Sequence, residues 1–167
     1  MYPYNRNTQL YDTQTRAKET AVQSETASLL AQDKRLEELL SLAKEEARQT
    51  AQKFEALLHS VELSEAETIL KTMYLDGIKH LRLLQEVGFQ IFGTAPQTAE
   101  IPRADAAEDT CALLEELLLG EMDDIAFYRD LLFSMPETDL RDCFFEIITD
   151  KQNHTAAISH LYAKYFR

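Results

Sequence analysis

The segments FEALLHSVELSEAETILKTMYLDGIKHLRLL (residues 54–84) and YRDLLFSMPETDLRDCFFEIITDKQNHTAAI (residues 128–158) decide the fold, because they look like two copies of one helical hairpin. An offset of 74 positions, from residue 54 to residue 128, aligns them without a gap. Such self-similarity indicates an internal duplication. The polar residues that coincide are Ser60 and Ser134, Asp76 and Asp150, and His80 and His154.

The composition favours a helical protein with a single core. The chain has 167 residues, of which 45% are apolar, and only four are Gly and four are Pro. This length supports one complete hydrophobic core, and so few turn residues are typical of long helices. Cys111 and Cys143 show neither metal-type nor redox-type spacing, so we expect two reduced thiols.

Charge and hydropathy narrow the expected partners and location. A net charge of −12 argues against nonspecific nucleic-acid binding, which depends on clustered Lys and Arg. No apolar run reaches the ~18 residues that a membrane span requires. The first residues also lack the cationic and apolar regions of a signal peptide. We therefore expect no nucleic acid, no membrane span and a cytoplasmic location.

The hydrophobic pattern predicts two parts of the chain. Residues 1–27 are polar and lack a sustained period, which predicts a flexible arm, a candidate docking segment for an unknown protein partner. Residues 28–167 form the predicted bundle. Apolar residues recur there every three or four positions in four segments. The predicted helices cover about 33–61, 64–92, 105–134 and 138–165, with a crossover connector at about 94–104.

Local signals fix several of these boundaries. Ser64 can cap the second helix, with Glu67 completing a capping box. Gly93 is a plausible stop for that helix. The short turns make each hairpin antiparallel, and the longer connector joins the two hairpins. The predicted fold class is therefore all-α, an antiparallel four-helix bundle made of two related helical hairpins.

Polar residues interrupt the apolar stripes at one level of this bundle. Folding each hairpin about its turn brings Ala47 level with Gly77, and Glu121 level with Lys151. A buried charge without an opposite charge is heavily penalised, so we predict a buried ion pair between Glu121 and Lys151. His80 and His154 lie one turn further along. We expect each to bond the Asp one turn before it on the same helix, Asp76 and Asp150 respectively.

At this point the chain resembles the ferritin-like superfamily, most closely its rubrerythrin-like branch, over about residues 30–166. The resemblance rests on Glu121 followed by FYRDLL at 127–132, on DGIKH at 76–80 and on DKQNH at 150–154. It implies a bacterial-type, ferritin-like bundle with one long crossover. In that family one Glu from each of two helices, and Glu-x-x-His from each of the other two, hold two irons.

Departures from the family pattern indicate a degenerate di-iron site. Gly77 and Lys151 stand where the family has Glu, and Ala47 stands where it has the first-helix Glu, although Glu46 is adjacent. Of four carboxylates only Glu121 remains, and an ammonium group is added. Hard cations require oxygen ligands that this set lacks. We therefore expect no catalytic residues, no cofactor and no enzyme activity, and a structural or interaction module instead.

A metal-binding alternative remains open at the same level. His80, His154 and Glu121, with Asp76 or Asp150, form a ligand set for a remodelled mononuclear or di-metal site holding iron, zinc or manganese. Such a protein would act in iron handling or in oxidative-stress defence. Ala47 and Gly77 would leave a cavity or a water-filled pocket, or allow the first two helices to approach closely. Resemblance to the family also implies a homo-oligomer, in the first instance a dimer.

Overall fold

The computed structural model describes the backbone of residues 6–61, 64–93, 101–135 and 138–165, and the side chains within these ranges from residue 32 onward, Ser64 excepted. Helix is the only regular secondary structure in these ranges, which confirms the all-α class for them. The four helices are α1 (Arg6–Leu58), α2 (Ser64–Phe92), α3 (Thr110–Ser134) and α4 (Thr138–Tyr165).

The first helix begins much earlier than the sequence pattern predicted. Of the predicted flexible polar arm at residues 1–27, residues 6–27 are helical; residues 1–5 lie outside the described ranges. The physical reason is that residues 6–27 contain neither Gly nor Pro, so a helix that already exists propagates through them at little cost. The chain divides into two compact units, Met1–Leu39 and Leu40–Arg167.

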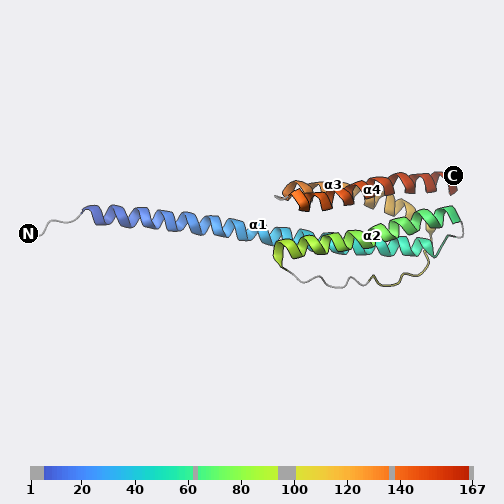
Figure 1. Cartoon of the computed structure of the whole chain (residues 1–167), viewed down its shortest axis with the longest axis horizontal. Coiled ribbons are helices and arrows are strands. Elements are labelled where there is room, and N and C mark those ends of the chain that lie inside the picture. Colours follow the sequence, from blue (N-terminus) through green and yellow to red (C-terminus); the bar gives the residue numbers. More distant parts are fainter. Residues whose placement is uncertain (1–5, 62–63, 94–100, 136–137, 166–167) are drawn as a thin grey trace, which may run out of the picture. The chain divides into compact units, whose positions relative to one another are not determined.

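The unit Leu40–Arg167 is built around a core to which all four helices contribute. Phe54 of α1, Leu70 of α2, Leu114 of α3 and Ile158 of α4 belong to one cluster of buried side chains. Burial recurs every three or four residues along each helix, as an amphipathic pattern requires. Figure 1 shows α3 and α4 side by side with α2 next to them, and α4 contacts both of these helices.

Specific contacts set how α3 lies against its neighbours. The Tyr162 hydroxyl of α4 donates a hydrogen bond to Glu115, near the start of α3, over 2.6 Å. Near the end of α3, the ring of Tyr128 lies 6.4 Å from that of Phe144, in the first half of α4. The Tyr128 hydroxyl also donates to the Ala43 carbonyl of α1 over 3.3 Å. Early residues of α3 thus lie beside late residues of α4, and α3 also reaches α1.

The connector before α3 lies along α1. The Ala104 amide donates to Glu55 over 2.8 Å, and the Ala107 amide donates to the Ser60 hydroxyl over 2.7 Å. Because these two amides are bonded to α1, residues 105–109 are not helical, and the predicted start of the third helix near Asp105 is wrong. α3 starts at Thr110, where the Asp109 side chain accepts from the Ala112 amide over 2.9 Å and caps the helix.

The ends of α2 agree with the sequence signals. α2 begins at Ser64, as predicted, although the capping role of its side chain lies outside the described side chains. Gly93 follows the last residue of α2 with a φ of 66°, and its amide donates to the Phe89 carbonyl over 2.8 Å. Glycine adopts this left-handed conformation without steric cost, which explains the stop.

Gly77 marks a close approach between α1 and α2. A methyl group built on Gly77 would lie 2.9 Å from Cβ of Ala51, closer than such atoms pack. Of the outcomes considered for the small residues, the close approach of the two helices is therefore the one observed. The residue opposite Gly77 is Ala51 rather than the predicted Ala47, which is also buried but one turn earlier.

Candidate functional site

Lys151 occupies the centre of a charged cluster in the core of the unit Leu40–Arg167. Its side chain is 2% exposed, and its Nζ lies 2.6 Å from Asp124 Oδ2 and 3.2 Å from Glu121 Oε1, both on α3. The same Nζ lies 5.7 Å from the centre of the Tyr128 ring, within cation–π range. The ammonium group is therefore held by two buried carboxylates and an aromatic face.

The two carboxylates that hold Lys151 differ in their proton affinity. Burial opposes ionisation of Glu121, but hydrogen bonding from His154 and the charge of Lys151 outweigh it, so the Glu121 pKa lies below its ordinary value. For Asp124, burial outweighs the attraction of Lys151, so the Asp124 pKa is raised. Glu121 is thus the firmly ionised partner, and Asp124 is the carboxylate that accepts a proton more readily.

His154 lies between two carboxylates, one on each ring nitrogen. Nδ1 is 3.3 Å from Glu121 Oε2, and Nε2 is 3.2 Å from Asp76 Oδ2. A neutral imidazole donates from only one nitrogen, and an ionised carboxylate can only accept. Both contacts are hydrogen bonds only if this group of three side chains carries one additional proton, on the ring or on a carboxyl oxygen.

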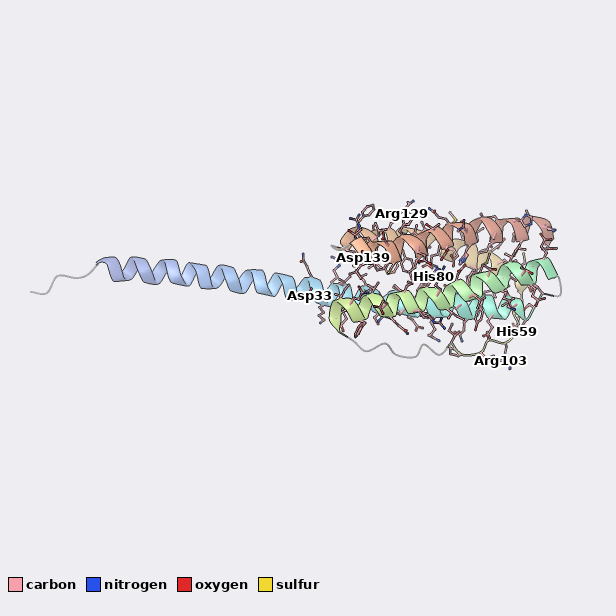
Figure 2. The ribbon with its side chains drawn as sticks, in the orientation of Figure 1. Asp33, His59, His80, Arg103, Arg129 and Asp139 are labelled. Carbon is pink, nitrogen blue, oxygen red and sulfur yellow. The ribbon has the colours of Figure 1, made fainter. Side chains whose placement is uncertain are left out.

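The second histidine is buried in a neutral state. His80 is 2% exposed, and its Nε2 lies 3.0 Å from Asp150 Oδ2. Burial, only partly offset by the hydrogen bond to Asp150, lowers the His80 pKa from 6.5 to about 4. Figure 2 shows His80 between the ribbon of α2 and those of α3 and α4. The two histidine rings lie 6.1 Å apart, centre to centre.

The histidine–aspartate pairs are exchanged relative to the prediction. We expected His80 to bond Asp76 and His154 to bond Asp150, each on its own helix; instead each ring bonds the Asp of the other helix. The reason is that the buried rings of α2 and α4 point across the space between the helices. Nε2 of each ring then lies within hydrogen-bond distance of the carboxylate on the facing helix. The two exchanged pairs are still equivalent under the repeat, because His80 corresponds to His154 and Asp150 corresponds to Asp76, each by 74 positions.

Lys79 connects the cluster to the solvent. Its side chain is 37% exposed, and its Nζ contacts Asp150 at 2.6 Å, Asp76 at 3.1 Å and Glu146 at 3.1 Å. Polar contacts therefore run without a break from Asp124 through Lys151, Glu121, His154 and Asp76 to Lys79. Among the described side chains, no buried nitrogen or oxygen lacks a hydrogen-bond partner. A fully satisfied polar network of this kind fixes one arrangement of the helices.

This donor set does not fit the metal centre that the family resemblance implies. Both nitrogens of His154 and the outer nitrogen of His80 face carboxylates at hydrogen-bond distance, and an ammonium group lies among the oxygens. Within the described part of the chain, no group of three or more His, Cys, Asp or Glu side chains is arranged to hold a metal ion. The five residues proposed as ligands, Asp76, His80, Glu121, Asp150 and His154, are nevertheless brought together.

Two residues of the cluster, Asp124 and Lys79, were not predicted from the sequence. Asp124 makes the shorter contact to Lys151, and it lies on the apolar stripe of α3, one turn after Glu121. An acidic residue at a core position was the available signal for it. Lys79 carried no comparable signal, because a lysine beside a core histidine usually faces solvent. Its role depends on carboxylates from two helices meeting at one point.

Comparison of the chain with protein-family models, with curated proteins and with solved structures gives no significant match in any of the three. Among the described residues, none of the helices combines the length and apolar character needed to cross a membrane.

Proposed function

We propose that this chain is a ferritin-like, rubrerythrin-related protein whose two related hairpins form an antiparallel four-helix bundle with a lost di-iron site. In this proposal it has no catalytic activity, works without a cofactor in the cytoplasm, and serves as a structural or interaction module. The internal repeat supports the two hairpins. The sequence motifs around Asp76, Glu121 and Asp150 support the relationship to the family.

The observation that carries the proposal is the position of Lys151. Its ammonium group lies within 3.2 Å of one oxygen from each of Glu121 and Asp124, in a site closed to solvent. In the family that the chain resembles, this helix position supplies a Glu ligand and the space beside it holds a metal. A lysine there provides a positive charge without a metal, so the remaining carboxylate stays neutralised and the core stays closed.

Metal analysis of protein purified without chelators tests this function. We expect substoichiometric iron, zinc and manganese, and no change in melting temperature on addition of Fe(II), Zn(II) or Mn(II), because a metal that does not bind the folded state cannot stabilise it. The alternative is a remodelled metal site acting in iron handling or oxidative-stress defence. Near-stoichiometric metal that disappears in the His80→Ala/His154→Ala variant would establish that alternative and overturn the proposal.

A second variant makes the test sensitive to the role of the ammonium group. Lys151→Glu removes the internal cation and restores a carboxylate at that position. We expect this variant to be destabilised and to regain part of its melting temperature when a divalent metal is added, unlike the unmodified protein. Lys71→Glu is the matched control, because it makes the same charge change at an exposed position of α2, nine residues before His80. An equal metal response in both variants would contradict the assignment.

A further inference from the structure

An apolar row and an acidic row of side chains run next to each other along the outer surface of α3. The apolar row is formed by three exposed residues spaced by seven positions: Leu119, which is 63% exposed, Ala126, and Phe133, which is 73% exposed. The acidic row is formed by three exposed residues with the same spacing: Glu116, Asp123 and Asp130. Each acidic residue precedes a member of the apolar row by three positions, so the acidic row borders the apolar row along its whole length.

The internal repeat shows that neither row is needed to build a hairpin. Moving back by 74 positions, the apolar row corresponds to three polar residues: Glu45, Gln52 and His59. The acidic row corresponds to three uncharged residues: Leu42, Gln49 and Ala56. The two rows therefore occur together only in the second hairpin. Exposed apolar side chains bordered by charge are typical of a surface that binds another protein.

The corresponding face of α1 is covered by a segment of the chain itself. The Gln52 side chain, which corresponds to Ala126, donates a hydrogen bond to the Pro102 carbonyl of the connector over 3.1 Å. The Ala56 carbonyl, which corresponds to Asp130, accepts from a connector amide over 3.3 Å. This helix face therefore already receives a further segment in the first hairpin. On α3 the equivalent side chains are exposed in the described structure.

We propose that the apolar row and the acidic row bind an amphipathic helix of another protein, whose apolar stripe is bordered by Lys or Arg. The spacing of seven supports a helix, because paired helices pack apolar residues that repeat every seven positions, and charged residues at the border select the partner. The rows extend from Glu116 to Phe133, about 26 Å at ~1.5 Å per residue, so a partner helix of about 18 residues would cover them.

The charge of the acidic row favours a cationic partner over a second copy. Asp123 and Asp130 form no ion pair within the described part of the chain, whereas Glu116 pairs with Lys53 of α1 at 2.8 Å. In an antiparallel pair of α3 helices, each border meets the same border of the copy, so the acidic rows would face and repel each other. Lys or Arg at the border of a partner helix attracts them instead, and the net charge of −12 attracts such a partner from a distance.

The opposite border of the apolar row has a different character. Met122 lies there, 56% exposed, and the exposed Arg129 follows it by seven positions. Arg129 forms no ion pair with the acidic row. The two borders of the face therefore differ in charge, which gives a bound helix one preferred orientation. None of these residues belongs to the charged cluster, so this proposal is tested separately from the loss of the metal site.

Isothermal titration of the full chain with two synthetic 18-residue helical peptides tests the charge of the partner. Both peptides carry the same Leu stripe, bordered by Lys in one and by Glu in the other. We expect the Lys peptide to bind at least tenfold more tightly, Phe133→Ser to weaken its binding at least tenfold, and Asp123→Lys/Asp130→Lys to reverse the preference. Glu37→Lys/Glu38→Lys is the matched control, because it makes the same change in net charge at exposed positions of α1 outside both rows. Equal binding of the two peptides, or equal effects of the two charge variants, would overturn the proposal.

A fluorescence measurement locates the bound peptide even if a surface variant fails to fold. In a Cys111→Ser/Cys143→Ser background, an environment-sensitive dye on Ala126→Cys should shift to shorter wavelength when the Lys peptide is added. The same dye on Gln90→Cys, an exposed position of α2, should not shift. Equal shifts at the two positions would overturn the proposal. Sedimentation velocity without peptide completes the test, because a dimer that Phe133→Ser abolishes would show that a second copy occupies this face instead.

Discussion

Replacing Lys151 by Met tests whether the internal ammonium group holds the bundle together. Methionine has a similar length and volume, so the packing is kept while the charge is lost. Glu121 then remains buried with only the His154 contact, and Asp124, whose pKa is already raised by burial, also loses its ammonium partner. The cost of protonating or stranding Glu121 alone therefore sets the minimum loss of stability.

The size of that cost follows from the ordinary Glu pKa. Holding a carboxyl of pKa 4.5 protonated at pH 7 costs about 3.4 kcal/mol, at 1.36 kcal/mol for each unit between pKa and pH. We therefore expect the free energy of unfolding to fall by about 3 kcal/mol at pH 7. In the variant the folded Glu121 pKa is raised, so this penalty is present above pH 4.5 and disappears as the pH falls towards that value. By pH 5 the difference from the unmodified protein should fall below about 1 kcal/mol.

Urea unfolding followed by circular dichroism, at pH 7 and pH 5, measures this difference. Lys79→Met is the matched control, because Lys79 also contacts three carboxylates but is partly exposed, and exposed ion pairs contribute under about 1 kcal/mol. Adding Glu121→Gln to Lys151→Met should recover at least half of the loss. Equal small losses in both single variants, or a loss independent of pH, would refute the buried ion pair as the element that closes the core.

Two further predictions concern pH and helix packing. The folded His80 pKa is about 4 and the ordinary value is 6.5, so the unfolded state binds more protons between these two values. The stability that His80 contributes is therefore fully present above pH 6.5, and about 3 kcal/mol is lost as the pH falls to 4. His80→Gln should flatten this part of a urea-unfolding pH series, and an unchanged slope would contradict the prediction. Gly77→Ala should destabilise the protein by about 1–2 kcal/mol despite its better helix propensity, since the added methyl meets Ala51 at 2.9 Å. Gly120→Ala, with nothing within 4 Å, should stabilise it by up to about 1 kcal/mol in the same thermal and urea measurements, and the opposite order of these two variants would be inconsistent with the close approach.

Periodicity and local turn chemistry were sufficient to predict most of the helices. α2 and α4 have the expected bounds, and Gly93 ends α2 with the left-handed conformation for which glycine is suited. These features depend on residues close together in the chain. The start of α3 was missed because the amides of Ala104 and Ala107 bond to α1, some fifty positions earlier. The helical stretch before residue 33 was missed because it lacks an apolar stripe, although nothing in its sequence interrupts a helix.

The candidate cluster was likewise predicted where residues close together in the chain determine it, and not where contacts between helices determine it. The sequence placed Glu121 level with Lys151 and the two histidines one turn further along, because heights along a hairpin follow from the helical rise. It predicted the wrong Asp partner for each histidine. Spacing of i, i+4 permits a bond within the helix, whereas the bond across helices depends on the distance between α2 and α4. That distance is set by the whole core.

The exchanged pairs give the charged cluster a structural role that pairs within one helix would lack. A bond from His80 to Asp76 would stabilise α2 alone, whereas the observed bonds from His80 to Asp150 and from His154 to Asp76 join α2 to α4. Sliding α4 along α2 by one turn would break both bonds and leave buried polar groups without partners, at a cost of about 1–3 kcal/mol for each group. The apolar stripes alone tolerate such a shift, because Leu, Ile and Val repeat along each helix. The polar contacts therefore select the register between α2 and α4, and this structural role does not depend on a bound metal.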